Sequence, residues 1–303
     1  MTHKLTAALI QLHRRWGDAR LSRWFGQYSI GQGTEALLDL TEQNSQGSQV
    51  QAENLAAKLE DQCAYVITRL DPDYPACFHA LDQDAPPLLY VIGDSGRLKA
   101  RSLAIIGMRK PTLDGKAAAV HMASGAGDAG WLVVSGNAPG IDSTAHSAVL
   151  DMETGETLVF PPVPLDQYKP GFRGETAGRV TIASPFPPGC EVAPWMFLRR
   201  NTLVATQCRA AFVAETGVRG GTLDTVKKLA ARRRPTFATL LPGEARYASA
   251  HSMLAAGGVS LLDVLSDPAS ALAVLLEAAQ STLAHPPVNA AVLNDFFADE
   301  EWA

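Results

Sequence analysis

The chain has 303 residues, of which 47% are hydrophobic and 19% are charged. This length and composition predict a globular protein with one large domain and a small one. The formal net charge of −5 argues against uniform coating of nucleic acid, although it leaves room for a local basic groove. No apolar run approaches the length of a membrane span and the N-terminus lacks a signal-peptide pattern, so we expect a cytoplasmic protein without membrane contact.

The cysteines are scattered and form no C-x-x-C pair, which predicts reduced thiols rather than a disulfide framework or a zinc site. They are Cys63, Cys77, Cys190 and Cys208. Histidines and carboxylates do not cluster at metal-ligand spacing, and no complete dinucleotide fingerprint follows any apolar run. We therefore expect no metal and no other cofactor.

The N-terminal part is predicted to be a small helical domain, residues 1–62. Leucines and tryptophans recur at helical spacing between residues 4 and 40. A stretch rich in Gln, Ser and Asn from Gln43 to Gln51 then indicates a loop or linker. From Tyr65 to Gly93 the sequence is rich in proline and strand-like.

From Ser102 onward short apolar runs alternate with helical segments, which predicts an α/β domain over residues 63–265, with a parallel sheet and helices on both faces. The predicted strands are 103–106, 131–134, 157–160, 179–183, 211–215 and 236–240. The predicted helices are 114–129, 141–150, 194–207 and 221–233. Residues 266–303 are expected to form a helix and an acidic tail, which either is a loose chain end or docks on a basic groove.

Three glycine-containing loops follow predicted strands, at residues 107–112, 135–142 and 215–222. Ligands of open α/β sheets bind where parallel strands end, because loop amides and helix N-termini converge there on negative charge. Three such loops at successive strand ends predict a site for a polyanion or a nucleotide.

In the first loop, Arg109 and Lys110 follow Gly107. An arginine at this place can make bidentate contacts to a phosphate. The alternative is a solvated basic turn.

The second loop places Asp142 where we expect the N-cap of a helix, although its carboxylate could also accept from a ribose hydroxyl. His146 lies one helical turn later. We expect a satisfied, partly buried histidine there rather than a catalyst.

The third loop follows Glu215, and it contains glycines and a threonine with amides that an anion could use. Arg199 and Arg200 are adjacent on a predicted helix, so at most one of them is expected to face a ligand. The densest basic run lies at residues 227–234, which is either a solvated helix face or part of a nucleic-acid surface.

These loops resemble motifs of the DNA-processing protein A family (DprA, also called Smf). The family pattern G-S-R-x-P-T-x-x-G is similar to Gly107-Met-Arg-Lys-Pro-Thr-Leu-Asp-Gly115, and S-G-x-A-x-G-I-D-x-x-A-H is similar to Ser135-Gly-Asn-Ala-Pro-Gly-Ile-Asp-Ser-Thr-Ala-His146. Further matches are Phe186-Pro-Pro-Gly189, Phe197-Leu-Arg-Arg-Asn-Thr-Leu-Val-Ala205 and Ala214-Glu-Thr-Gly-Val-Arg-Gly-Gly-Thr-Leu-Asp-Thr-Val226. The chain departs from the family pattern at Met108 and Thr202, and residues 260–303 show no counterpart of the family's C-terminal winged helix. These departures indicate a divergent member.

The resemblance implies an extended Rossmann-like fold and a homodimer that binds single-stranded DNA and delivers it to a RecA-type recombinase in natural transformation. It implies no established enzymatic activity. By position, the residues implied to hold the DNA backbone are Gly107, Arg109, Lys110, Ser135, Gly136, Gly140, Arg199, Arg200, Asn201, Gly220, Gly221 and Thr222. Lys169 and Phe172 are implied as a phosphate contact and a base-stacking contact.

An alternative within the same broader fold is a nucleotide-ligand sensor or an enzyme similar to the Lonely Guy phosphoribohydrolases. In that case Arg200, Glu215 and the loop 220–222 would imitate a nucleotide site. The basic run at 227–234 favours DNA, because a nucleoside-monophosphate hydrolase has no need of it.

Overall fold

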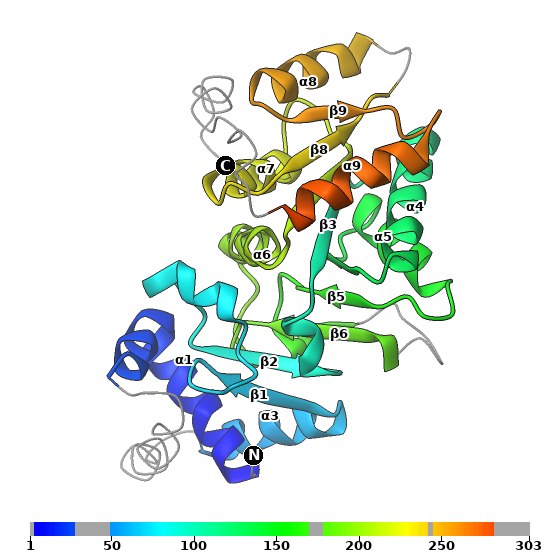
Figure 1. Ribbon diagram of the computed structural model, residues 1–303. Coiled ribbons are helices and arrows are strands. Elements are labelled where there is room, and N and C mark those ends of the chain that lie inside the picture. Colours follow the sequence, from blue (N-terminus) through cyan, green and yellow to red (C-terminus); the bar gives the residue numbers. More distant parts are fainter. Residues whose placement is uncertain (1–2, 28–48, 170–177, 242–244, 282–303) are drawn as a thin grey trace. The chain divides into compact units, whose positions relative to one another are not determined.

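The computed structural model describes residues 3–27, 49–169, 178–241 and 245–281 (Figure 1). The chain divides into two compact units, one of residues 1–99 and 159–196 and one of residues 100–158 and 197–303. This division cuts the chain differently from the three successive parts expected from the sequence, which remain a prediction. Phe172 and the acidic tail lie outside the described residues.

The first unit combines two helices with a small antiparallel sheet. Its helices are α1 (His3–Phe25), which has a non-helical residue at Gly17, and α3 (Gln49–Asp61), which packs against α1. Its strands, in the order β1-β2-β6, are β1 (Ala64–Thr68), β2 (Leu88–Ile92) and β6 (Val180–Ser184). Three short 3-10 helices connect them: η1 (Ala76–Asp84), η2 (Ser95–Leu98) and η3 (Leu165–Gln167).

The second unit is built on strands in the order β5-β4-β3-β7-β8-β9. They are β3 (Ser102–Gly107), β4 (Leu132–Ser135), β5 (Thr157–Val159), β7 (Ala210–Glu215), β8 (Thr236–Thr239) and β9 (Ser260–Leu262). The β4–β3, β3–β7, β7–β8 and β8–β9 pairs are parallel. Strands β3 and β7 are buried along nearly their whole length, because helices cover both faces of the sheet.

The helices of this unit are α4 (Leu113–Asp128), α5 (Ile141–Leu150), α6 (Pro194–Gln207), α7 (Gly221–Ala231), α8 (Ala245–Ala256) and α9 (Pro268–Gln280). Helices α4, α5 and α9 lie on one side of the strands, and α6 and α7 lie on the other (Figure 1). Helices on both sides of a parallel sheet confirm the predicted fold class.

The predicted strands and helices from residue 102 onward agree with the observed ones to within one or two residues. The sequence analysis did not foresee α8 or β9, the latter being a strand of three residues that is too short for a recognisable alternation. Cys63, Cys77, Cys190 and Cys208 are not joined by disulfides in the structure. Among the described residues no helix is both long and apolar enough to cross a membrane.

Candidate functional site

The first predicted loop is fastened to the end of β7 by a carboxylate. The buried Glu215 accepts hydrogen bonds from the backbone amide and the hydroxyl of Thr112, each 2.8 Å long. Thr112 in turn caps α4, because its hydroxyl oxygen accepts from the amide of Gly115 at 3.1 Å. Protein groups therefore occupy the amino end of α4, which we had expected to face an anion.

Arg109 and Lys110 are the exposed basic residues of this loop. The guanidinium carbon of Arg109 lies 5.6 Å from the centroid of the Phe197 ring, a cation–π distance. Phe197 is half-buried on α6, so the aromatic ring supports Arg109 while leaving its charge accessible. This pair is a contact that the sequence analysis missed.

The second loop is also organised around a carboxylate. Asp142 accepts from the amides of Gly136 and Ala138, each at 3.3 Å. The expectation that Asp142 is an N-cap was wrong, because Gly140 occupies the cap position with φ of 96°. A side chain at Gly140 would lie 2.5 Å from the carbonyl oxygen of Met108, so the close approach of the two loops requires glycine.

Arg200 lies on the inner side of this loop, with its Nη1 3.8 Å from Oδ2 of Asp142. Its guanidinium fills the space that a side chain at Gly136 would need. Burial raises the pKa of Asp142 above its ordinary 3.8, and the charge of Arg200 opposes that rise. Arg200 therefore stabilises a buried carboxylate, and its role as a phosphate contact remains a prediction.

A chain of polar contacts continues from Arg200 to α7. Nε of Arg200 donates to Asn201 at 2.9 Å, and the amide nitrogen of Asn201 donates to Asp224 at 2.8 Å. Lys228 pairs with Asp224 at 2.5 Å. Asn201 is thus buried between α6 and α7, and Arg199 beside it is only partly exposed.

His146, on α5, is fully buried, more deeply than the partly buried histidine that the sequence predicts. Its Nδ1 lies 2.6 Å from Oγ1 of Thr157, and that hydroxyl donates to the carbonyl of Val133 at 2.7 Å. Because the hydroxyl proton is used there, Thr157 must accept from the histidine, which places a proton on Nδ1. Burial and, to a smaller extent, the charge of Arg200 lower the pKa of His146 to about 3, so the ring is neutral at pH 7.

The third loop differs from the other two. No side chain caps α7, whose N-cap is Gly220 with φ of 120°. A Cβ atom added at Gly220 or Gly221 would meet nothing within 4 Å. The amino end of α7, with Thr222 in its first turn, is therefore open, and a positive helix end of this kind attracts an anion.

The basic run at 227–234 has a structural explanation in part. Nε of Arg232 donates to the hydroxyl of Thr206 at 2.7 Å, and Arg234 donates to the carbonyl of Thr206 at 3.1 Å. Thr206 belongs to the last turn of α6, where cations stabilise unpaired carbonyls and the negative end of the helix dipole. Arg233 is exposed.

Lys169 is exposed and belongs to the first unit, whereas the other predicted site residues that the structure describes belong to the second.

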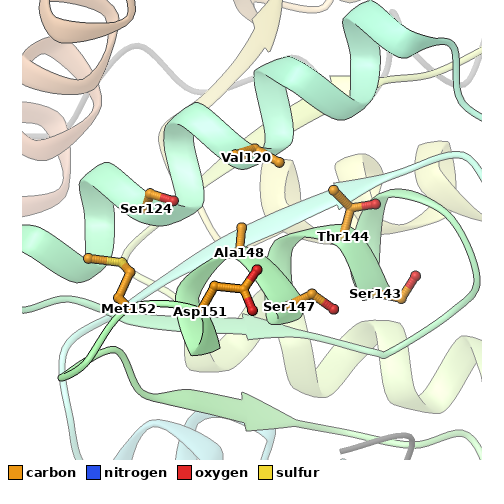
Figure 2. A pocket seen from close by; sticks show the side chains of 8 residues that line it. All are labelled: Val120, Ser124, Ser143, Thr144, Ser147, Ala148, Asp151 and Met152. Atoms are coloured by element: carbon orange, nitrogen blue, oxygen red, sulfur yellow. The ribbon is translucent and has the colours of Figure 1, made fainter.

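A cavity of about 460 Å³ lies between α4 and α5 (Figure 2). Its lining residues are Val120, Ser124, Ser143, Thr144, Ser147, Ala148, Asp151 and Met152, none of them a predicted site residue. Within the described ranges there is no cluster of three potential metal ligands.

Comparison with solved structures supports this fold. The DNA processing protein A of Streptococcus pneumoniae superposes with a TM-score of 0.61 at 22% identity, covering 88% of this chain and 98% of that one. The protein of the same name from Helicobacter pylori, whose structure is described in terms of its single-stranded DNA binding mode, gives a TM-score of 0.60 at 22% identity over 71% and 96% of the two chains.

Sequence comparisons agree. A putative DNA processing protein of Mycobacterium tuberculosis is 35% identical over 147 residues, which are 46% of this chain and 38% of that protein. The Streptococcus pneumoniae protein is 30% identical over 178 residues, 57% and 61% of the two chains. The chain thus matches less than two thirds of the length of these relatives. The DNA recombination-mediator protein A family model matches residues 65–270, more than half of the chain, and the protein belongs to this family.

Proposed function

We propose that the protein binds single-stranded DNA by its phosphates, at the edge of the second unit's sheet where β3 and β7 end. The observation that carries the proposal is the open amino end of α7, on the loop next to the one that presents Arg109 and Lys110. The two loops are neighbours because β3 and β7 pair directly, with Gly107 opposite Glu215. Loop amides and two accessible cations together form a phosphate-binding surface.

Exposed apolar side chains at this edge favour a single strand over a duplex. Leu113 is 82% exposed, Leu198 45% and Val218 42%, and the half-buried ring of Phe197 lies under Arg109. The faces of unpaired bases can pack on such side chains, whereas the bases of a duplex are already stacked. The single-stranded DNA binding described for the relative from Helicobacter pylori supports the same choice.

The biological role follows the family. Bound DNA would be protected and passed to a RecA-type recombinase during recombination or natural transformation, by a homodimer in the cytoplasm. Co-precipitation with a recombinase, in the presence and absence of DNA, tests the delivery step. Light scattering tests the homodimer.

The alternative of a nucleotide sensor or phosphoribohydrolase has less support. A nucleotide site there would need Glu215 and Arg200 to face the ligand. Glu215 instead holds Thr112, and Arg200 is buried against Asp142. Both groups therefore serve the fold.

Fluorescence anisotropy with labelled oligothymidylate tests the proposal. Affinity should fall with salt, with a log–log slope of about −0.7 for each phosphate contacted. Arg109→Ala and Lys110→Ala should each weaken binding, whereas Arg15→Ala, which removes an exposed arginine of α1, should not. The proposal would be contradicted by binding that does not depend on salt or by a preference for duplex DNA. Release of ribose phosphate from nucleoside monophosphates would contradict it as well.

A further inference from the structure

Basic side chains follow α7 from one edge of the sheet to the other. We name as the α7 track the residues Arg219, Lys227, Lys228, Arg233 and Arg209. The three arginines are exposed and the two lysines are partly exposed. The acid on this helix, Asp224, already pairs with Lys228 and Asn201, so it cancels little of the remaining charge.

The topology gives the track its direction. Helix α7 leaves the carboxyl end of β7 and leads to the amino end of β8, and its 11 residues span about 16 Å. Its apolar residues, among them Val226 and Leu229, are buried, so Lys227 and Lys228 lie on the opposite, outer side. The track therefore begins at the open glycine loop and ends at the far edge of the sheet.

Arg209 and Arg233 both lie at that far end, where β7 and β8 begin. Ala211 pairs with Thr236 in the parallel β7–β8 ladder, so Arg209 and Arg233 precede paired residues of two neighbouring strands by two and three residues. Arg232 and Arg234 are engaged with Thr206. The guanidinium groups of Arg209 and Arg233, in contrast, form no hydrogen bond or ion pair with any residue that the structure describes, so capping of α6 does not explain them.

The other face of the same unit has the opposite charge. Helices α4, α5 and α9 lie on the side of the strands away from α7 (Figure 1). The exposed charged residues of these helices and of the turns that follow them are mostly acidic. The acidic ones are Asp114, Asp128, Asp151, Glu153, Glu156 and Glu277, and the basic ones are Lys116 and, bonded to the turn after α4, Arg101. With a net charge of −5 for the chain, this separation concentrates positive potential on the α7 side.

We propose that the α7 track binds a second stretch of the same DNA strand, continuing from the phosphate site at Gly220 and Gly221. This inference rests on the proposed function. A DNA strand suits the track better than an acidic peptide, because the track is continuous with the loop site and its charges lie in a line rather than in a cluster. The contacts are to phosphates and carry no base preference.

The experiment compares oligothymidylates of about six and about twenty nucleotides, since binding sites of single-strand binders cover roughly 4–16 nucleotides. The test variant is Arg209→Glu/Arg233→Asp, in which aspartate suits the left-handed backbone at residue 233, where φ is 52°. The control variant, Arg15→Glu/Lys58→Glu, changes the net charge equally at exposed positions of the first unit. Circular dichroism checks folding, and Arg209→Gln/Arg233→Asn replaces the test pair if charge reversal unfolds it.

The test variant should bind the long oligonucleotide roughly tenfold more weakly than wild type, with a salt slope smaller by about 1.4, the value for two phosphates. Its affinity for the short oligonucleotide should stay within about twofold of wild type, because a strand of that length fills only the loop site. The track would be overturned if the test variant lost equal affinity for both lengths, or if the control variant lost as much affinity as the test variant. It would also be overturned if polyglutamate displaced the long oligonucleotide as readily as unlabelled DNA does.

The two proposals fail separately. If wild type does not bind the short oligonucleotide, or if Arg109→Ala leaves that binding unchanged, the loop site is wrong. If the loop site holds and only the length dependence is missing, the track alone is wrong.

Discussion

Nη1 of Arg200 lies 3.8 Å from Oδ2 of Asp142, and the two side chains are only 8% and 9% exposed. This pair joins α6 to the first turn of α5 and leaves little of either charge at the surface. Arg109, by contrast, is exposed on the neighbouring loop over the ring of Phe197. The two arginines were equivalent candidates for phosphate binding, but the structure gives them different surroundings and hence different expected effects on mutation.

Replacing Arg200 should destabilise the fold. Arg200→Met leaves the Asp142 carboxylate buried without its cation, and we expect the free energy of unfolding to fall by about 3–5 kcal/mol. Arg109→Ala, at an exposed position, should change it by no more than about 0.5 kcal/mol. Urea denaturation of both variants measures the difference.

The double variant Arg200→Met/Asp142→Asn is the control, since it removes both buried charges. It should recover part of the stability lost in Arg200→Met. Full stability of Arg200→Met combined with loss of DNA affinity would show instead that Arg200 contacts the ligand directly.

Apart from α8 and β9, the sequence predicted the elements of the second unit well, because their signals are local. Apolar runs such as residues 103–106 mark buried parallel strands, and the glycine loops mark the strand ends. The contacts that organise the loops were not predictable in this way. Glu215 holds Thr112 from 103 residues away, and only the pairing of β3 with β7 brings them together.

The same limit explains why the role of Asp142 was predicted wrongly. Asp142 was expected to cap α5, yet Gly140 adopts the cap position and frees the carboxylate to bind the loop amides. In the basic run near residue 230, two of the arginines bind Thr206 on α6, so only the remaining residues of the run are left as candidates for nucleic acid. Which charged groups find an internal partner depends on packing, and the local sequence does not record it.

His146 should make stability depend on pH. Its folded-state pKa of about 3 lies below the ordinary 6.5, so the folded protein binds fewer protons than the unfolded chain between these values. Neutral His146 therefore contributes on the order of a few kcal/mol to the unfolding free energy above pH 6.5, and this contribution is lost as the pH falls toward 3. Asp142 has the opposite sign, since burial raises its pKa and its contribution decreases as the pH rises above 3.8.

The variant His146→Gln isolates the histidine, because an amide can still donate to Thr157 but does not titrate. The difference in unfolding free energy between wild type and this variant should increase from about pH 4 to about pH 7. A constant difference over that range would mean that the imidazole is accessible and not buried.

Gly115 and Gly221 provide a matched pair of substitutions in the first turns of two helices. A Cβ at Gly115 would collide with the Glu215 carboxylate and lie 2.9 Å from its Cβ, whereas a Cβ at Gly221 meets nothing within 4 Å. Gly115→Ala should therefore lower the unfolding free energy by about 1–3 kcal/mol. Gly221→Ala should leave it unchanged or raise it by up to about 1 kcal/mol, because alanine restricts the unfolded chain. Equal stabilities in thermal denaturation would refute the crowding at Glu215.

The open end of α7 allows a test in which stability and binding move in opposite directions. Gly221→Asp places a carboxylate in the first turn of α7, much as Glu215 already serves α4. A negative charge there should stabilise the helix by about 0.3–1 kcal/mol. The same charge repels a phosphate, and losing the helix end as a ligand should weaken DNA binding roughly tenfold or more, as expected for a charge-assisted contact.

Gly221→Asn is the control, since it has nearly the same size and can also cap a helix but carries no charge. It should keep most of the affinity of wild type. Anisotropy at low salt, where screening is weakest, gives the largest separation between the two variants. Because the aspartate variant is at least as stable as wild type, its lower affinity cannot be ascribed to unfolding. Equal affinities for Gly221→Asp and Gly221→Asn would exclude the amino end of α7 as the phosphate site and move it to the Arg109 loop alone.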